Sequence, residues 1–275
     1  MTDSGLPTTL PDTPEEEAPT AGLVLNPTIQ TQLDHRTIRA FTDEPVDEAT
    51  VATLLDVARH ASTSSFYQQA TIIRIKDPQI RERIYHASGQ PYVGASEGEL
   101  FIFVIDLSRT ARIRERAGAD MEPVGRASVF IQGVEDTLLA AQNVAVAAES
   151  LGLGICYLGS IGGDPEEVIN ALKLPKYTYP LVGMLVGHPA QHPQKKPRLP
   201  RAITTAIDTY PDVSSSEYSR AWDQYDRTIQ TYYDMREGGA RQDTFTNQLI
   251  KKVGGGKAEK TDLLRILHDQ GLCTH

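Results

Sequence analysis

Four side chains that suit phosphate binding stand close together near the start of the chain, in the stretch DHRTIR at residues 34–39. His35, Arg36 and Arg39 offer imidazole and guanidinium donors, and Thr37 adds a hydroxyl. Guanidinium forks match phosphate oxygens well, in both geometry and charge. Taken alone, the stretch also fits a helix end whose basic groups interact with exposed backbone carbonyls.

A second basic cluster favours the anion-binding interpretation. Lys195, Lys196 and Arg198 lie in a proline-rich segment whose composition disfavours a helix. If the two clusters converge in the fold, they form a local anion site in a chain with a formal net charge of −9 and a pI near 5.3. The negative net charge itself argues against a nucleic-acid binder, which needs a broad positive surface.

Other polar segments could contact a heterocyclic ligand. The loop of Ser62, Thr63 and Ser64 offers hydroxyls and backbone amides, and Phe66 could form an apolar wall beside it. The simpler alternative is a loop that ends a helix, since serine and threonine favour such places. Gln90, in SGQPYV, presents an acceptor and donors that suit an imide edge, although glutamine in such a segment is also ordinary turn chemistry.

The stretch YLGS follows an expected strand, so the backbone of Leu158, Gly159 and Ser160 could approach a planar ring closely. Several common active-site motifs are missing from the sequence: GxGxxG, a Walker A lysine motif and HExxH. The two cysteines, Cys156 and Cys273, form no CxxC pair, so neither a zinc site nor a disulfide framework is expected.

Hydrophobic periodicity predicts alternating helices and strands, and therefore a layered domain. Asn26 followed by Pro27 is typical of a helix start. The expected strands cover 71–75, 100–105, 154–159 and 180–187. The expected helices cover 49–61, 78–88, 129–151 and 217–237, with two shorter ones around Leu249 and Leu264.

The chain is expected to have three parts. Residues 1–25 hold four prolines, five acidic residues and no basic residue, which predicts a disordered acidic tail. Residues 26–198 form the main domain, and residues 199–275 form a C-terminal extension. With no apolar run long enough for a membrane span and no signal-peptide pattern, we expect a cytoplasmic protein without membrane contact.

Seven motifs, taken in order, resemble the oxygen-insensitive NADPH nitroreductase and NADPH:flavin oxidoreductase group of the nitroreductase family. They are HRTIRAFTDEPV, STSSFYQ followed by TIIRI, GQPYV, AAESLGLGICYLGS, LKLP, KKPRLP and RQDTF. Each is weak alone, but their common order from Thr28 to the C-terminus is specific. The resemblance implies an α+β fold, a three-layer sheet-and-helix domain whose C-terminal arm embraces the partner subunit of a homodimer.

The resemblance also implies one FMN per subunit, held at the dimer interface. His35, Arg36, Thr37, Lys196 and Arg198 are expected at its phosphate. Arg39 and Gln90 are expected at the pyrimidine side. The other expected cofactor contacts are Ser62, Thr63, Ser64, Leu158, Gly159 and Ser160. Family members often have glycine at the position of Ser160, so a side chain here is expected to intrude beside the flavin.

The implied reaction is a ping-pong transfer of two electrons from NADPH to nitroaromatics or quinones. Arg39 and Phe66 are the residues expected to act in catalysis, with Arg39 stabilising the charge of the reduced ring. Arg236 and Arg241 are expected to contact the 2′-phosphate of NADPH. Two alternatives stay open: an NADPH:FMN oxidoreductase that supplies reduced flavin, and a flavin-binding sensor that turns over little.

Overall fold

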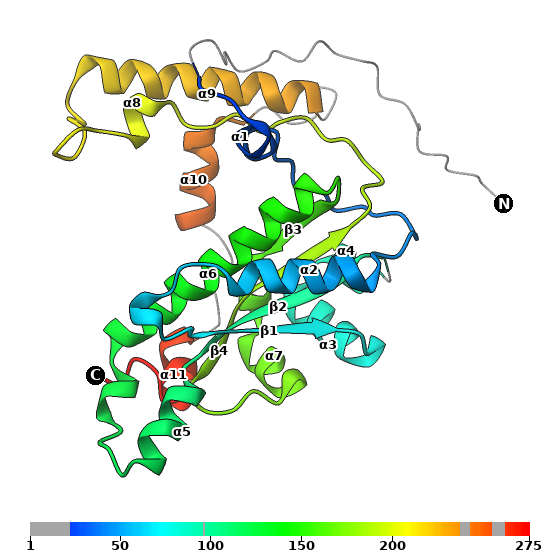
Figure 1. Ribbon diagram of the computed structural model, residues 1–275. Helices are drawn as coiled ribbons and strands as arrows, with labels where there is room; N and C mark the ends of the chain where they lie inside the picture. Colours follow the sequence, from blue (N-terminus) through cyan, green and yellow to red (C-terminus); the bar gives the residue numbers. More distant parts are fainter. Residues whose placement is uncertain (1–22, 96, 237–242, 255–261) are drawn as a thin grey trace.

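The computed structural model describes residues 23–95, 97–236, 243–254 and 262–275, and Figure 1 shows its arrangement. A four-stranded antiparallel sheet with strand order β1-β2-β4-β3 forms its centre. The predicted strands are confirmed, each within two residues of its expected ends. The strands are β1 (Ala70–Ile75), β2 (Glu99–Asp106), β3 (Gly154–Leu158) and β4 (Thr178–Gly187).

Alternation of side chains along β2 explains how the sheet carries helices on both faces. Phe101 and Phe103 belong to the hydrophobic cluster on one face, whereas Leu100 and Ile102 belong to the cluster on the other. All four are fully buried, as expected of a central strand covered on both sides. The predicted α+β fold with three layers is therefore confirmed.

Helices α2 (Glu48–Arg59) and α6 (Ala127–Ser150) pack together over the first face. Asp47 caps α2 by accepting from Thr50 N–H at 2.9 Å. At Gly133, α6 crosses very close to β2, because an added Cβ there would stand 2.6 Å from Ile105 Cγ2. Any larger residue at position 133 would push α6 away from the sheet.

The second face is covered by α3 (Pro78–Ser88), α4 (Pro91–Gly94) and α7 (Pro165–Leu172), together with the 3-10 helix η3 (Gly159–Gly163). Helix α3 has the bounds that the sequence predicts, and it ends at Gly89 in the left-handed conformation with φ of 62°. Two expected ligand-contacting segments thus lie at the same face: Gln90, which precedes α4, and the start of η3 at Gly159 and Ser160.

Helix α1 (Pro27–Leu33) begins as predicted, with Asn26 Oδ1 accepting from Ile29 N–H at 2.8 Å. The segment after it runs beside β3, where Ile38 N–H donates to Ile155 O at 2.9 Å and Thr37 forms a parallel bridge with Ile155. Gly154 permits this close approach, because a Cβ there would stand 2.6 Å from Ile38. The strand edge thus fixes the position of the DHRTIR stretch.

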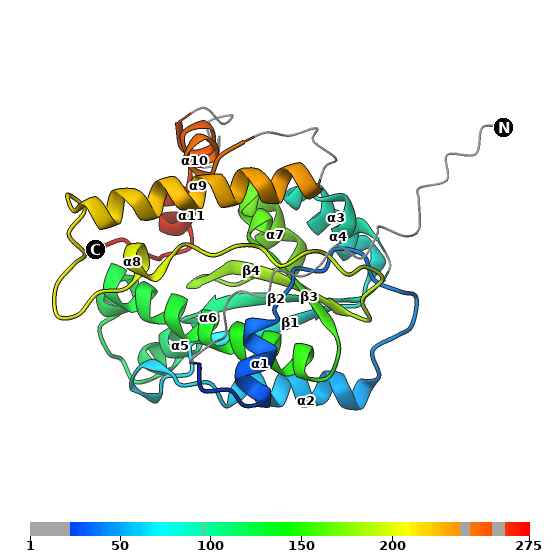
Figure 2. The same cartoon turned by 90° about the horizontal axis from the view of Figure 1, so that it is seen from above.

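The C-terminal part begins with α8 (Arg201–Thr204), α9 (Ser216–Arg236) and α10 (Phe245–Gly254), which Figure 1 shows above the sheet and apart from it. Figure 2 shows the same helices from above. Phe245 joins the last two helices, because its ring stacks on Trp222 at 5.9 Å and meets Tyr225 edge-on at 5.2 Å. Tyr225 also donates to Pro197 O at 3.2 Å, so α9 lies along the proline-rich segment.

The chain end returns to the body of the same subunit. Helix α11 (Leu263–Asp269) packs with α5 (Ser108–Arg116) and the 3-10 helix η2 (Glu122–Gly125) in a third hydrophobic cluster. Ala127 N–H donates to His275 O at 3.0 Å, which fastens the terminus. A partner-packing role for 199–275 therefore remains a prediction for α8 to α10, whereas α11 belongs to the body.

Across the described ranges, no helix combines the length and the apolar character needed to cross a membrane. The same residues contain no cluster of three or more histidine, cysteine or acidic side chains that could hold a metal ion. The predicted disordered tail falls on residues 1–25, of which 1–22 lie outside the described residues.

Candidate active site

One cleft brings the two basic clusters together, although they are about 160 residues apart in the sequence. It encloses about 320 Å³ of empty space, open solvent included. Its lining comes from the DHRTIR stretch, the proline-rich segment and α9. The lining residues are His35, Arg36, Thr37, Arg39, Pro193, Gln194, Lys196, Arg198 and Tyr232.

Backbone pairing explains why the clusters converge. Thr42 N–H donates to His188 O at 2.9 Å, Ala190 N–H donates to Ala40 O at 3.0 Å, and Phe41 bridges Pro189. The segment after the first cluster is thereby tied to the segment that leads into the second. Convergence thus depends on main-chain hydrogen bonds and needs no contact between the basic side chains themselves.

The charge in the cleft is strongly unbalanced. Arg36, Arg39, Lys196 and Arg198 are basic side chains, and none of the described residues that line the cleft is acidic. Asp34 lies outside the lining and pairs with Lys195, whose hydrogen bond holds the pKa of this carboxyl below its ordinary value. The cleft is therefore suited to an anion with several acceptor oxygens.

Glu149 orients the histidine of the cleft. Its Oε1 lies 2.5 Å from His35 Nδ1, and both side chains are largely buried. A carboxylate can only accept, so Nδ1 carries the hydrogen and Nε2 is the nitrogen left for a ligand. The sequence analysis missed Glu149 because it lies on α6, 114 residues away from His35. Its position near the end of an alanine-rich helix was the only available signal.

Arg39 connects the cleft to α4. Its guanidinium carbon lies 5.8 Å from the centre of the Tyr92 ring, close enough for a cation–π contact. Gln90 is the residue just before α4. Burial raises the pKa of the Cys156 thiol, and Arg39 and Lys196 both oppose that rise. Cys156 is therefore a core residue beside the cleft and not a reactive thiolate.

Arg81 fixes the segment that follows Gln90. Its guanidinium donates to Val93 O at 2.9 Å and to Gly98 O at 2.8 Å, and burial lowers its pKa. These bonds hold both ends of the turn after α4. Arg81 therefore anchors residues on the C-terminal side of Gln90.

The end of β3 lines a second hollow with open backbone. Gly159 has no atom within 4 Å of the place where a Cβ would stand, so the main chain there is accessible. The hollow is lined by Ser88, Gly159, Ser160, Gly162, Gly163, Tyr179 and Leu263. The Leu158 side chain, in contrast, is buried in the core, so only its backbone can meet a ligand.

The loop of Ser62, Thr63 and Ser64, which also carries Phe66, lies away from the cleft within the chain. Ser64 N–H donates to Asp136 on α6, whereas the cleft histidine pairs with Glu149 on the same helix. Thirteen residues of α-helix separate these two positions by about 20 Å. Figure 1 shows the loop beside the first half of α6 and α1 over its far end.

The expected contacts to the 2′-phosphate of NADPH are only partly within the described structure. Arg236 is the last residue of α9, and its side chain is not described. Arg241 lies outside the described residues. Three lining residues, Pro193, Gln194 and Tyr232, were not predicted from the sequence, although tyrosine on an amphipathic helix was a visible signal.

Two family models match the chain over most of its length. One, described as the nitroreductase family, covers residues 33–188, and the other, described as the C-terminal domain of the nitroreductase family, covers residues 196–275. The chain belongs to the nitroreductase family. The resemblance that its seven motifs indicate is thereby confirmed.

Curated relatives and solved structures agree with this assignment. The chain is 40% identical over 228 residues to a Bacillus subtilis (strain 168) protein named FMN reductase (NADPH), covering 82% of this chain and 91% of that one. It is 41% identical over 241 residues to a Staphylococcus aureus (strain MRSA252) protein named NADPH-dependent oxidoreductase, covering 86% of this chain and 94% of that one.

Among solved structures, the chain resembles the NfrA1 nitroreductase from Bacillus subtilis with a TM-score of 0.85 at 36% identity, covering 90% of this chain and all of that one. It also resembles an NADPH:FMN oxidoreductase from Vibrio harveyi, solved in complex with NAD⁺. That match has a TM-score of 0.80 at 32% identity and covers 91% of this chain and all of the other.

Proposed function

We propose that the chain is an FMN-dependent oxidoreductase that takes electrons from NADPH. The observation that carries the proposal is the cleft that four cationic side chains line together, Arg36, Arg39, Lys196 and Arg198. Relatives named FMN reductase (NADPH) and NADPH-dependent oxidoreductase support the same cofactor and donor. The cleft and the names of the relatives both support an oxidoreductase that uses FMN and NADPH.

The cleft fits the phosphate end of FMN. A phosphate monoester carries close to two negative charges and three acceptor oxygens, which Arg36, Lys196 and Arg198 can match with charge-assisted hydrogen bonds. His35 adds Nε2 and Thr37 adds a hydroxyl. Electrostatic attraction towards this local positive site also counteracts the repulsion from the chain's net charge of −9.

The ring end is proposed to extend from Arg39 towards the end of β3. Arg39 reaches α4 through Tyr92, which brings it to the element that follows Gln90. In this arrangement the Gln90 side chain forms hydrogen bonds with the imide edge of the flavin, and the open backbone at Gly159 lies against the flavin ring. Leu158 contributes only its main chain, because its side chain is in the core.

When bound, FMN supplies the two-electron chemistry, accepting a hydride from NADPH and passing both electrons to an oxidant. The contribution of Arg39 is a fixed positive charge beside the pyrimidine side of the ring, which stabilises negative charge that develops there. The described cleft lining contains no carboxylic acid. Water is therefore proposed to supply the second proton that a quinone or nitro group needs.

A homodimer with the flavin at its interface is proposed for two reasons. Helix α6 leaves Ile131, Leu138 and Leu139 about half exposed, and their spacing places them on one side of the helix. Helix α10 also exposes apolar side chains, Ile250 and Val253. A second subunit that covers these surfaces would exclude them from water.

The position of the serine-rich loop supports the same arrangement. Within one chain, Ser64 lies about 20 Å along α6 from the phosphate cleft. Ser62, Thr63, Ser64 and Phe66 are therefore proposed to line the flavin of the partner subunit. Each flavin would then need residues from two chains.

Nitroaromatics and quinones are the proposed oxidants, and free FMN, reduced for use elsewhere, is the second candidate. The name FMN reductase (NADPH) of a relative favours the second, whereas the nitroreductase neighbours favour the first. The test is anaerobic mixing of the purified protein with NADPH, followed by a quinone or free FMN. Rapid bleaching of a bound flavin supports the proposal, and a protein that retains no flavin after reconstitution refutes it.

The NADPH preference is proposed to depend on Arg236 and Arg241. Changing both to alanine should raise the KM for NADPH and leave the value for NADH and the kcat nearly unchanged, because a uniform binding interaction is lost. Steady-state kinetics with both donors test this. If the two KM values rise equally, these arginines do not recognise the 2′-phosphate.

A further inference from the structure

The loop between α2 and β1 has an unusual backbone at residues 64–69, which we call the clamped loop. Ser65, Phe66 and Gln68 have φ values of 50°, 60° and 55°. The left-handed region is unfavourable for residues with a Cβ, and three such residues in one short loop do not adopt it without external support. Backbone of this kind is concentrated at functional sites.

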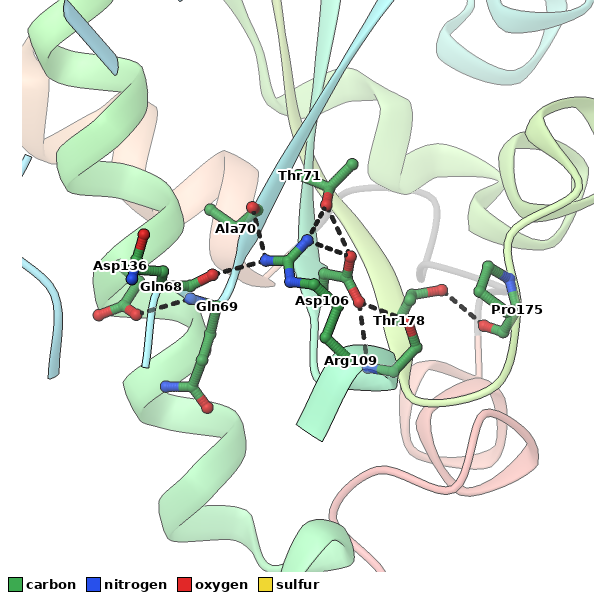
Figure 3. Close-up of polar contacts among 10 residues, drawn as sticks. Gln68, Gln69, Ala70, Thr71, Asp106, Arg109, Asp136, Pro175 and Thr178 are labelled. Carbon is green, nitrogen blue, oxygen red and sulfur yellow. Dashed lines mark hydrogen bonds and ion pairs between the residues drawn. The ribbon is translucent and has the colours of Figure 1, made fainter. Parts of the chain in front are cut away.

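One buried carboxylate holds both ends of the clamped loop. Asp136 on α6 is only 1% exposed. Its Oδ1 accepts from Ser64 N–H at 2.7 Å, and its Oδ2 accepts from Gln69 N–H at 3.0 Å. Figure 3 shows this carboxylate facing Gln69 from the helix. Since a carboxylate is acceptor-only, both oxygens suit this task, whereas an amide would present a donor to one of the two N–H groups.

A second group fixes the chain where it leaves the loop. Arg109 donates to Gln68 O at 2.5 Å and to Ala70 O at 3.0 Å, and it also pairs with Asp106 at 2.8 Å, as Figure 3 shows. The exit into β1 is thus held independently of Asp136. The remaining freedom of the clamped loop lies between Ser64 and Gln69, where Asp136 acts.

The side chains within the clamped loop do not stabilise its shape by burial. Phe66 is 81% exposed and Tyr67 is 61% exposed in the single chain. Within the turn, Phe66 N–H donates to Thr63 O at 3.3 Å and Tyr67 N–H to Ser64 O at 3.0 Å. An exposed aromatic ring on a left-handed backbone serves no packing purpose in its own subunit. The conformation of the clamped loop is therefore maintained by its hydrogen bonds to Asp136.

We propose that Asp136 is a positioning residue of the enzyme: it holds the clamped loop in the left-handed form that presents Phe66 to the flavin site. The inference rests on the proposed function in one respect, namely that Phe66 faces a bound flavin. It adds a distinct role for a buried carboxylate that touches neither cofactor nor substrate. Gly133, one turn earlier on α6, supports it by letting the helix approach β2 closely.

The test is a double-mutant cycle of Asp136→Asn and Phe66→Ala. Asp136→Asn is expected to raise the KM for a quinone about tenfold with little change in kcat, and Phe66→Ala is expected to do the same. Because both act through one ring, the double variant should show no further rise. If the two effects multiply, Asp136 does not act through Phe66 and the proposal fails.

Hydrogen exchange of the purified protein in the absence of substrate gives a readout that does not depend on turnover. Hydrogen exchange at the Phe66 and Tyr67 amides should become at least tenfold faster in Asp136→Asn, because the turn bonds open when the ends are released. Asp164→Asn is the control, since Asp164 caps α7 by accepting from Glu167 N–H at 3.0 Å, far from the loop in sequence. Unchanged exchange in Asp136→Asn contradicts the proposal.

Ser65→Pro covers the case in which Asp136→Asn does not fold. Proline fixes φ near −65°, so it cannot adopt the left-handed form at this position, and the carboxylate is left in place. The same rise in KM is expected, and a parent-like KM overturns the proposal. FMN content is measured for the parent and for every variant. A parent protein that holds no FMN refutes the proposed function. Variants that hold FMN and keep the KM of the parent refute only the role of Asp136.

Discussion

The basic cleft and the clamped loop position their functional side chains by different means. In the cleft, main-chain pairing between residues 40–42 and 188–190 brings charged residues together, and each side chain extends from backbone that is already fixed. In the clamped loop, the backbone itself depends on carboxylates from other elements, Asp136 and Asp106. Substitutions in the cleft should therefore remove single contacts, whereas substitutions under the loop should change the conformation of several residues.

The largest expected effect is loss of FMN binding when the phosphate contacts of the cleft are removed. Lys196→Ala combined with Arg198→Ala deletes two charge-assisted hydrogen bonds, each worth about 1.5 to 3 kcal/mol. The Kd for FMN should rise by more than about 100-fold. Quenching of flavin fluorescence during titration of apoprotein measures the change.

Lys195→Ala is the matched control for that double variant. Lys195 also carries a positive charge in the same segment, but it pairs with Asp34 and does not line the cleft. Its removal should change the Kd for FMN less than about threefold. Equal losses in the control and the double variant would mean that general charge, and not the cleft geometry, attracts the ligand.

Asp106→Asn tests the frame of the clamped loop and should have the next largest effect. Asp106 accepts from Thr71, Ser108 and Arg109, at 2.6 to 3.0 Å. Loss of the carboxylate leaves these donors poorly matched and should reduce the free energy of unfolding by about 3 kcal/mol. Denaturant unfolding at neutral pH measures it, and a loss below about 1 kcal/mol would show that Arg109 alone is sufficient.

The pH dependence of that loss follows from the ionisation of Asp106. Burial opposes its ionisation, but hydrogen bonds from Ser108 and Thr71 and the charge of Arg109 hold its pKa below the ordinary 3.8. A carboxyl with a depressed folded pKa stabilises the fold above its unfolded pKa and loses this contribution as pH falls through the folded value. The stability difference between parent and variant should therefore be constant above pH 5 and narrow below 3.8.

Glu149→Gln tests how a side chain of the cleft is oriented, and its effect should be smaller. The neutral amide no longer orients the His35 ring through an ionised acceptor, so the phosphate should lose about one hydrogen bond and FMN affinity should fall about tenfold. Titration of apoprotein measures this. Riboflavin, which lacks the phosphate, should bind parent and variant equally. An equal loss of riboflavin affinity would show that Glu149 does not act through the phosphate.

The smallest expected effect concerns Arg39. Arg39→Gln should leave the fold and most FMN binding intact, but it removes a positive charge beside the ring. The reduction potential of bound FMN should fall by about 20 mV, which corresponds to about 1 kcal/mol for two electrons. Spectroelectrochemistry reports it, with Arg39→Lys as the charge-conserving control. An unchanged reduction potential would show that Arg39 does not lie beside the pyrimidine side of the flavin.

Local patterns predicted the elements and much of the cleft from the sequence. Asn26 with Pro27 predicted the start of α1, and runs of β-branched and other apolar residues predicted the strands within two residues of their ends. The residue types of DHRTIR and of Lys196 and Arg198 already indicated an anion site. That prediction required the two basic clusters to lie close together in the fold, and in the structure they line the same cleft.

Features that depend on distant contacts were not predictable in the same way. Helix α5 was not predicted, because its charged sequence SRTARIRER has only a narrow apolar side. The separation between Ser64 and the cleft depends on where α6 crosses the sheet. Asp136 is one acidic residue in a helix, and only the fold shows that it is buried beneath a loop about 70 residues earlier.

The central claim is that the cleft recognises the phosphate of a flavin, and calorimetric titration of apoprotein with FMN and with riboflavin tests it most directly. The two ligands share the ring and differ by the phosphate. With at least two charge-assisted contacts to that group, FMN should bind more than about 100-fold more tightly than riboflavin at the same ionic strength. Equal affinities for the two ligands would contradict the account.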